Sequence, residues 1–205
     1  MTPAPQDRLL DAALPLIAFE GWTDRALEEA TKNAGLAPAD LRRAFPGGAA
    51  EALEYFTIRA DRQMRETLTR DYNLASMKIR ERIATIVMVR LGQQLPHREA
   101  VRRGRAFYAL PWNAPAGLRA LWRTMDEIWH LAGDTATDWN HYSKRLILAQ
   151  VYLATLEIWL GDNSAGMAET EAFLRRRIDN VMQFEKFKAR VTSDSGAFFS
   201  RFRRV

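Results

Sequence analysis

Residues 9–47 read LLDAALPLIAFEGWTDRALEEATKNAGLAPADLRRAFPG, a stretch in which glycines and prolines separate three segments of helical period. The first segment is predicted to be a helix that ends at Gly21. The Thr-Asp pair after Trp22 is expected to cap a second helix, because both side chains accept hydrogen bonds from a first helical turn. Pro38 opens a third helix, which runs to Phe45 before the next proline and glycines. Three consecutive short helices are therefore predicted.

The rest of the chain also follows a helical period, and no convincing run of alternating strand residues interrupts it. A short basic helix is expected over 97–108, and longer helices over 49–71, 75–94, 118–132, 138–160 and 165–190. The helix over 138–160 is apolar nearly all round, so it should lie centrally or at an interface. The sequence thus predicts an all-α protein of nine main helices.

The three short helices resemble the N-terminal helix-turn-helix of TetR-type regulators, in which the short third helix enters the major groove of DNA. The alternative is a plain three-helix packing unit. Residues 1–50 hold five basic and seven acidic side chains, a net charge of −2. Because affinity for DNA comes largely from neutralising phosphates, an acidic unit is poorly equipped to bind it. We expect a TetR-like fold that has lost DNA binding, although Arg42 and Arg43 could still touch phosphate.

Changes in composition divide the chain into four parts. Residues 1–47 form the helix-turn-helix-like unit, and residues 48–190 form a larger helical domain. Thr, Ser, Asp and Gly dominate 191–196, which is typical of a flexible linker. Residues 197–205 are then a separate terminal segment.

Composition excludes several classes of protein. The 205 residues include no cysteine, so a disulfide framework, a thiolate metal site and a cysteine nucleophile are ruled out. The longest apolar stretch near the start, 12–19, is far shorter than the roughly 20 residues of a spanning helix. The N-terminus also lacks the basic and then apolar order of a secretory signal. A soluble protein, or one bound to a membrane surface, is expected.

The most informative motif is GDTATDWNHYSKR at 133–145. With its flanks it resembles the ninth coenzyme Q biosynthesis protein family, a TetR-fold family that binds lipid instead of DNA. The resemblance runs from about residue 9 to 188 and includes AFPGGAAEALEYF at 44–56. It implies a non-catalytic accessory role in ubiquinone biosynthesis. The protein would bind an isoprenoid quinone precursor or phospholipid and present quinone precursors to the di-iron hydroxylase of the pathway.

By matched position, the resemblance implies a partner-facing patch of Asp138, His141, Tyr142 and Arg145. His141 departs from the family pattern, since eukaryotic members carry tryptophan there. The spacing alone also puts Asp138, Tyr142 and Arg145 on one helix face, and aromatic and arginine side chains are typical of binding hot spots. The alternative is a capped helix start with an internal ion pair from Asp138 to Arg145 or Lys144.

Aromatic and aliphatic residues of the second half predict the lipid site, since five of the six tryptophans follow residue 110. Helical spacing places apolar stripes on the helices over 118–132 and 138–160. Such stripes either pack in the core or line an apolar cavity, where affinity comes from area removed from water. The candidate lipid-binding residues are Trp122, Met125, Trp129, Tyr142, Leu146, Tyr152 and Leu156.

No enzymatic site, cofactor or metal centre is expected. The E-x-x-H at Glu127 and His130 occurs once, whereas ferritin-like metal sites need two copies and two further glutamates. His130 is instead expected in the core or at a pocket edge, and no phosphate loop, G-x-S-x-G or zinc spacing is present. The alternative function is a TetR-type regulator with an apolar effector pocket.

Residues 197–205, AFFSRFRRV, are predicted to form a membrane-surface helix on anionic lipid. At about 100° per residue the phenylalanines share one arc, and the arginines flank and oppose it. The alternative is a helix that packs permanently on the body of the protein. The predicted membrane-binding residues are Phe198, Phe199, Arg201, Phe202, Arg203 and Arg204. A homodimer is expected, in the bacterial cytoplasm or on the mitochondrial matrix side.

Overall fold

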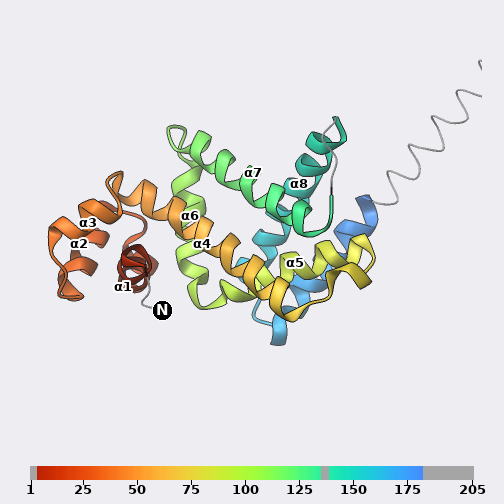
Figure 1. Ribbon diagram of the computed structural model, residues 1–205, viewed down its shortest axis with the longest axis horizontal. Coiled ribbons are helices and arrows are strands. Elements are labelled where there is room, and N and C mark those ends of the chain that lie inside the picture. The colour runs from red at the N-terminus through yellow and green to blue at the C-terminus, as the bar shows by residue number, and fades with distance from the viewer. Residues whose placement is uncertain (1–3, 135–138, 182–205) are drawn as a thin grey trace, which may run out of the picture.

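The computed structural model describes residues 4–134 and 139–181, except for the side chains of 139 and 140. Within these ranges every regular element is helical, which confirms the all-α prediction (Figure 1). The helices are α1 (Pro5–Glu20), α2 (Asp24–Asn33), α3 (Pro38–Ala44), α4 (Gly48–Asp71), α5 (Ile79–Gln93), α6 (Arg98–Ala109), α7 (Ala114–Leu131) and α8 (Trp139–Gly161), and a further helix covers 168–181. Short 3-10 turns occupy Leu74–Ser76, Leu95–His97 and Ala165–Met167.

Helices α1, α2 and α3 form the predicted N-terminal unit around their own apolar core. Gly21 ends α1 with a φ of +81°, a conformation that favours glycine. The hydroxyl of Thr23 caps α2 by accepting a hydrogen bond from the backbone N–H of Ala26 (3.1 Å). Trp22 is buried and donates from Nε1 to the carbonyl of Ala100 on α6 (2.9 Å), which fastens this unit to the rest of the molecule.

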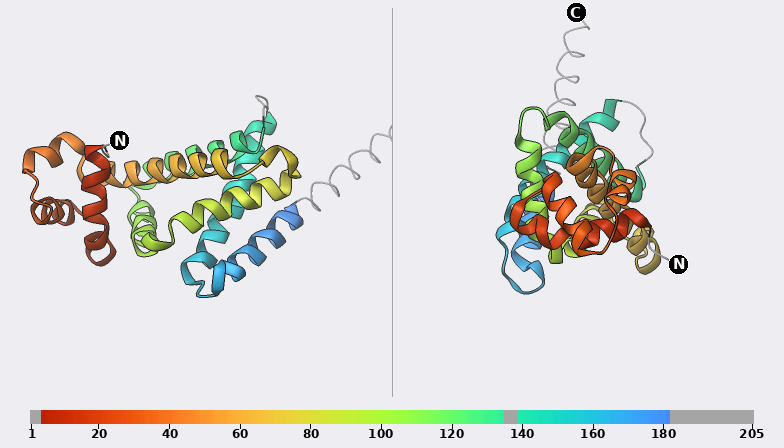
Figure 2. Two further views of the ribbon diagram at one scale, coloured as in Figure 1. Left: turned by 60° about the horizontal axis from the view of Figure 1, so that its bottom comes forward. Right: turned by 90° about the vertical axis from the view of Figure 1, so that its left-hand side faces the viewer.

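The other helices build a second apolar core next to the N-terminal unit. Figure 2 shows α1–α3 at one end of an elongated molecule, with α4 running lengthwise from this unit into the bundle. Buried side chains of α4, α5, α7, α8 and the helix over 168–181 fill this core, among them Met64, Val87, Ile128, Trp159 and Leu174. No helix in the described part of the chain is both long enough and apolar enough to cross a membrane.

Three helices begin elsewhere than the sequence pattern predicts. The last one begins at residue 168 instead of 165, because a 3-10 turn occupies Ala165–Met167. Helix α7 begins at Ala114 instead of residue 118, because Pro115 is tolerated in a first turn where no intrahelical N–H bond is needed. Helix α5 begins at Ile79 instead of residue 75, after a 3-10 turn. There the carboxylate of Glu81 accepts from the backbone N–H of Lys78 (3.2 Å), which marks the true helix start.

Candidate ligand cavity and partner surface

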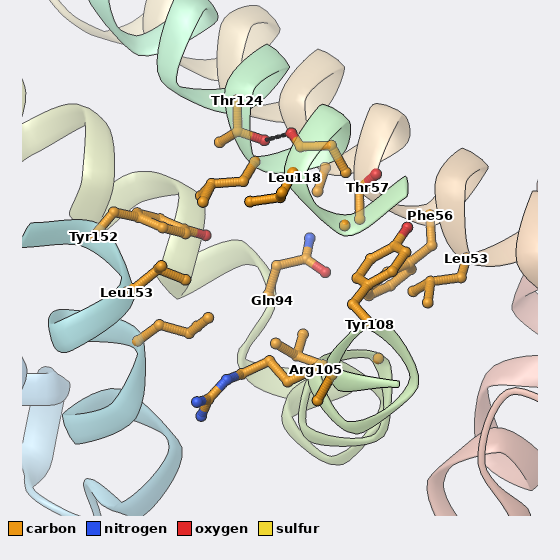
Figure 3. A pocket seen from close by; sticks show the side chains of 18 of the residues that line it. Leu53, Phe56, Thr57, Gln94, Arg105, Tyr108, Leu118, Thr124, Tyr152 and Leu153 are labelled. Atoms are coloured by element: carbon orange, nitrogen blue, oxygen red, sulfur yellow. Dashed lines mark hydrogen bonds between the residues drawn. The ribbon is translucent and has the colours of Figure 1, made fainter. Parts of the chain in front are cut away.

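An apolar cavity of about 380 Å³ lies between α4, α5, α6, α7 and α8 (Figure 3). Large side chains from four of these helices form most of its wall. They are Leu53 and Phe56 of α4, Tyr108 of α6, Leu118 and Leu121 of α7, and Tyr152, Leu153 and Leu156 of α8. Its volume is within the range of small-ligand sites.

Small residues explain both the close approach of the helices and the space left between them. A Cβ on Gly117 would lie 2.8 Å from the Cβ of Tyr108, so this glycine lets α6 and α7 meet at the cavity wall. A Cβ on Gly104 would lie 3.0 Å from a methyl carbon of Leu53. Ala60 of α4 and Ala120 of α7 also face the cavity, and their short side chains leave its middle unfilled.

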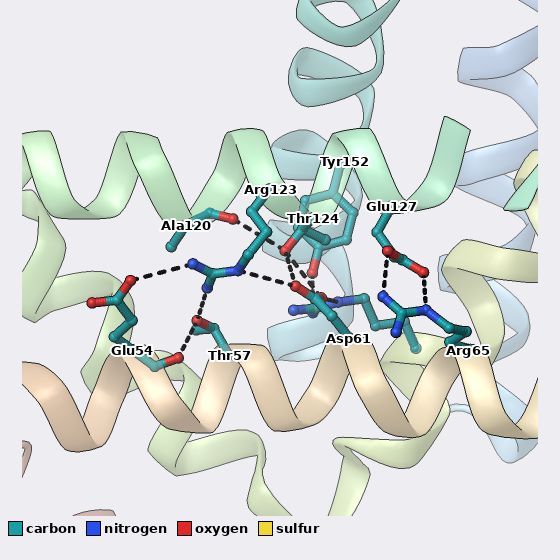
Figure 4. Close-up of polar contacts among 10 residues, drawn as sticks. Glu54, Thr57, Asp61, Arg65, Ala120, Arg123, Thr124, Glu127 and Tyr152 are labelled. Atoms are coloured by element: carbon teal, nitrogen blue, oxygen red, sulfur yellow. Dashed lines mark hydrogen bonds and ion pairs between the residues drawn. The ribbon is translucent and has the colours of Figure 1, made fainter. Parts of the chain in front are cut away.

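A buried polar network borders one side of the cavity and joins α4, α5, α7 and α8. Arg90 donates from Nε to Asp61 Oδ1 (2.9 Å) and from a terminal nitrogen to the Tyr152 hydroxyl (2.6 Å). The hydroxyl of Thr124 donates to the same carboxylate (3.0 and 3.1 Å). Figure 4 shows this carboxylate between the side chains of Thr124, Tyr152 and Arg123, whose Nε lies 3.7 Å away.

Burial sets the protonation of this network. Burial disfavours the charge of Arg90, but Tyr152 and Asp61 outweigh that effect and raise the pKa of the guanidinium. Burial also raises the pKa of Tyr152, which therefore stays a neutral hydroxyl at physiological pH. On the α6 wall, burial raises the pKa of Tyr108 to about 12. The cavity consequently offers apolar surface with neutral hydroxyls and two paired cations, Arg90 and Arg105.

The predicted lipid-binding residues fall into three different environments. Tyr152 and Leu156 line the cavity. Met125 is fully buried in the helical core, and Trp129 packs against that core with the ammonium of Lys144 5.5 Å from its ring centroid. The remaining three, Trp122, Tyr142 and Leu146, lie on the outside of the molecule.

Phe56 and Tyr108 also line the cavity but were not predicted, because they come from helices other than the two with predicted apolar stripes. Phe56 is a buried residue of the long helix α4, and Tyr108 belongs to the basic helix α6. The spacing of Gly104 and Gly117 was the available signal, since glycines within helices mark close backbone approach. The paired charges Asp61 and Arg90 gave no such signal, because only the tertiary structure brings them together.

The outer residues form a continuous apolar strip, called here the α7/α8 surface, made of Leu118, Trp122, Tyr142 and Leu146. The rings of Trp122 and Tyr142 are stacked, with centroids 5.9 Å apart and planes inclined by 29°. The His141 ring packs edge-on against the Tyr142 ring, with the ring centroids 5.2 Å apart. Leu118 is 67% exposed, Tyr142 57% and Leu146 58%, so three of these four side chains are mostly in solvent. Leu118 belongs both to this strip and to the cavity wall.

Arg145 does not lie on this surface. Its side chain is buried beneath the start of α8 and donates from Nε to Asp126 (2.7 Å) and from a terminal nitrogen to Asp134 (3.3 Å). Lys144 also binds Asp134, at 2.6 Å. An internal ion pair was one of the two predicted alternatives, but its acids are Asp126 and Asp134. Asp138 lies outside the described residues.

One further prediction was wrong. His130 is exposed to solvent, not buried in the core or at the pocket edge, because α7 turns this residue away from its packed faces. Its E-x-x-H partner Glu127 is engaged by Arg65 through two hydrogen bonds of 2.5 and 2.6 Å (Figure 4). Within the described ranges, no cluster of three or more His, Asp or Glu side chains could hold a metal ion. The linker at 191–196 and the six membrane-binding residues predicted within 197–205 lie outside those ranges.

Comparison with known proteins gives three kinds of match. The family model COQ9 matches residues 114–185. The ubiquinone biosynthesis protein COQ9 of Rattus norvegicus, named as mitochondrial, is 30% identical over 198 residues, which are 94% of this chain and 63% of that protein. The Homo sapiens protein of the same name is 29% identical and covers 94% of this chain and 62% of its own length. The chain thus spans less than two thirds of these relatives.

Among solved structures, the TetR transcriptional regulator of Nitrosomonas europaea superposes with a TM-score of 0.70 at 20% identity. The match covers 85% of this chain and 95% of that one. At this identity the match identifies the fold, and it confirms the TetR-like arrangement predicted from residues 9–47. Both resemblances predicted from the sequence are therefore confirmed: the chain is similar to COQ9 over 94% of its length, and it has the fold of the TetR-type regulator.

Proposed function

We propose that this protein acts in ubiquinone biosynthesis as a non-catalytic accessory protein, which holds an isoprenoid quinone precursor and presents it to the di-iron hydroxylase of the pathway. Similarity to COQ9 over 94% of the chain supports the pathway. The apolar cavity of about 380 Å³ is the observation that carries the ligand class. A phospholipid chain has the same apolar chemistry and is the other candidate occupant.

The cavity suits an isoprenoid tail because α4, α6, α7 and α8 line it largely with aliphatic and aromatic side chains. Two isoprene units have ten carbons, and burying them stabilises a complex by on the order of 8 kcal/mol. Lost translational and rotational freedom offsets much of this gain. The net affinity therefore depends on how well the ligand fills the cavity. A larger side chain introduced at the wall should take up that space and weaken binding.

A cavity-filling variant tests the lipid site directly. Leu121→Trp places a larger side chain at the α7 wall, and Leu95→Trp makes the same substitution at an exposed position that does not line the cavity. Titration with a fluorescent polyprenyl phenol should show affinity at least tenfold weaker for Leu121→Trp and unchanged for Leu95→Trp. Equal affinity of both variants and the wild type would reject the cavity as the binding site.

The α7/α8 surface is the proposed contact for the hydroxylase. Exposed aromatic rings that are already stacked lose little freedom on binding, and such side chains dominate interface energetics. Of the four predicted partner residues, Tyr142 belongs to this surface and His141 packs edge-on against it, which supports the proposal. Arg145 would act indirectly, by holding the start of α8.

Aromatic truncation tests this contact. Trp122→Ala and Tyr142→Ala should each weaken hydroxylase association by at least tenfold while circular dichroism stays unchanged. Phe19→Ala is the matched control, since Phe19 is an exposed aromatic residue on α1 in the N-terminal unit. If the control and the two variants behave alike, the surface is not the docking site.

Attachment to anionic membranes through Phe198, Phe199, Arg201, Phe202, Arg203 and Arg204, and the homodimer, remain predictions, as does the absence of DNA binding. The proposed location is a membrane surface facing the bacterial cytoplasm or the mitochondrial matrix. Flotation with anionic liposomes should show binding that decreases with salt and disappears when 197–205 are deleted. Equal flotation of the truncated chain would reject this role for the segment.

A further inference from the structure

Gln94 places an amide with unused hydrogen-bonding capacity in the cavity. It follows α5 directly, lines the cavity and is only 4% exposed. Its Oε1 is buried and accepts no hydrogen bond from any of the described residues. Buried acceptors of this kind are rare in folded proteins because leaving them unpaired is destabilising. Such a group is explained when a ligand supplies the missing donor.

The backbone holds this amide in place. The N–H of Gln94 donates to the carbonyl of Leu91 (3.1 Å), and its own carbonyl accepts from the N–H of His97 (2.9 Å) at the end of the following 3-10 turn. Figure 3 shows the amide in the middle of the cavity, with Tyr152 and Leu153 on one side and Tyr108 on the other. A ligand that fills the cavity therefore contacts this amide.

The polar side chains of the wall on the side of Arg90 are already engaged within the protein. The guanidinium of Arg90 binds Asp61 and the Tyr152 hydroxyl. The hydroxyl of Thr124 donates to the same carboxylate. These groups satisfy one another and leave Gln94 as the amide available to a polar ligand group.

The unpaired Oε1 of Gln94 determines which kind of polar ligand group can bind there. An amide oxygen accepts hydrogen bonds, so the group that meets it must carry a donor. A hydrocarbon tail has no donor, and neither has an acyl ester. A phenolic hydroxyl on a ring has one, and its oxygen can in turn accept from the amide nitrogen.

Resting on the lipid-binding role proposed above, we infer that the ring of an amphipathic phenol lies at Gln94, with its hydroxyl donating to Oε1. Gln94 then selects a ring with a free hydroxyl over the same ring with that hydroxyl methylated. The tail leaves past Leu118 and Leu153, two cavity-lining side chains that are partly exposed. Leu118 also borders the α7/α8 surface, so this exit faces the proposed partner contact.

The test compares two probes that differ by one methyl group, 2-farnesylphenol and its methyl ether. The wild-type chain should bind the phenol on the order of tenfold more tightly, since only the phenol donates to the buried oxygen. Gln94→Leu should abolish this preference and leave the affinity for the ether within about twofold. It should also raise the melting temperature of the ligand-free chain, because it removes an unpaired buried acceptor.

Gln93→Leu is the matched control. Gln93 is adjacent and carries the same side chain, but its amide nitrogen donates to the Gln63 carbonyl (3.2 Å) and the Thr67 hydroxyl (2.8 Å) on α4. Its Oε1 also has no partner among the described residues, but it does not line the cavity, so a ligand there cannot reach it. This variant should lower stability and keep the preference for the phenol. If Gln94→Leu fails to fold, Gln94→Met replaces it with an unbranched side chain of similar size.

The outcomes distinguish the proposed lipid-binding function from the proposed role of Gln94. Equal wild-type affinity for the two probes would overturn the role of Gln94 and leave lipid binding standing. A preference that survives in Gln94→Leu or Gln94→Met would do the same. If neither probe binds the wild-type chain, both the proposed function and this inference are overturned.

Discussion

The ion pair between Asp61 and Arg90 is expected to be energetically asymmetric. Both side chains are buried beside the cavity. Asp61 accepts from Arg90 and Thr124 and also lies 3.7 Å from the Nε of Arg123. Arg90 is held only by Asp61 and by the neutral hydroxyl of Tyr152 among the described residues. Loss of Arg90 thus leaves Asp61 with a second cation nearby, whereas loss of Asp61 leaves Arg90 without an anion.

These contacts set the size of the effect. Asp61→Leu should destabilise the protein by about 3–5 kcal/mol, the usual effect of leaving a buried charge unpaired. Arg90→Met should cost about 2–3 kcal/mol, because Thr124 and Arg123 still compensate the carboxylate. The double variant should cost less than the sum by about 2 kcal/mol or more, since neither charge is then left alone.

Urea unfolding of the four proteins, followed by tryptophan fluorescence, measures these differences as shifts in midpoint at constant slope. The wild type serves as the reference for each single variant. Additivity within about 0.5 kcal/mol would refute the coupling. A larger loss for Arg90→Met than for Asp61→Leu would refute the asymmetry.

Two further predictions concern stability. Arg145→Met should destabilise the protein by about 2 kcal/mol, because the buried Asp134 then keeps only Lys144 as its cation and Asp126 loses its arginine. Tyr142→Ala, at an exposed ring, should cost less than about 1 kcal/mol in thermal denaturation. Equal losses would contradict this. Burial raises the pKa of Asp162, but hydrogen bonds from Ser164 and Thr170 outweigh it and lower that pKa below its usual range. The stability that the ionised carboxylate contributes is complete above the unfolded pKa of about 3.9 and is lost as pH falls below it. The melting temperature of Asp162→Asn should therefore decrease less steeply with falling pH than that of the wild type.

The sequence predicts helix boundaries well where a single residue sets them. Gly21 and Pro38 bound their helices at the predicted positions, since a positive φ and a first-turn proline are properties of single residues. The same signals misplaced the start of α7, because Pro115 can end a helix or open one. Whether a proline ends or begins a helix depends on tertiary contacts, which the sequence pattern does not show.

The cavity could be predicted only in part, for a related reason. Helical spacing identifies which residues share a face, but not which neighbouring helix covers that face. Met125 and Trp122 were assigned to one stripe, yet Met125 is buried in the core and Trp122 is stacked on Tyr142 at the surface. Gln94 and the pair of Asp61 with Arg90 acquire their roles only when α4, α5 and α8 assemble.

The most direct test of the account is the ligand carried by the purified full-length chain. Native mass spectrometry, followed by denaturing extraction, should identify about one isoprenoid quinone precursor or phospholipid per chain. The same measurement on Leu121→Trp should show that occupancy strongly reduced, because the larger side chain enters the cavity. A wild-type chain that carries no lipid, and whose melting temperature ignores added quinone and phospholipid, would contradict the claim that this cavity is a lipid site.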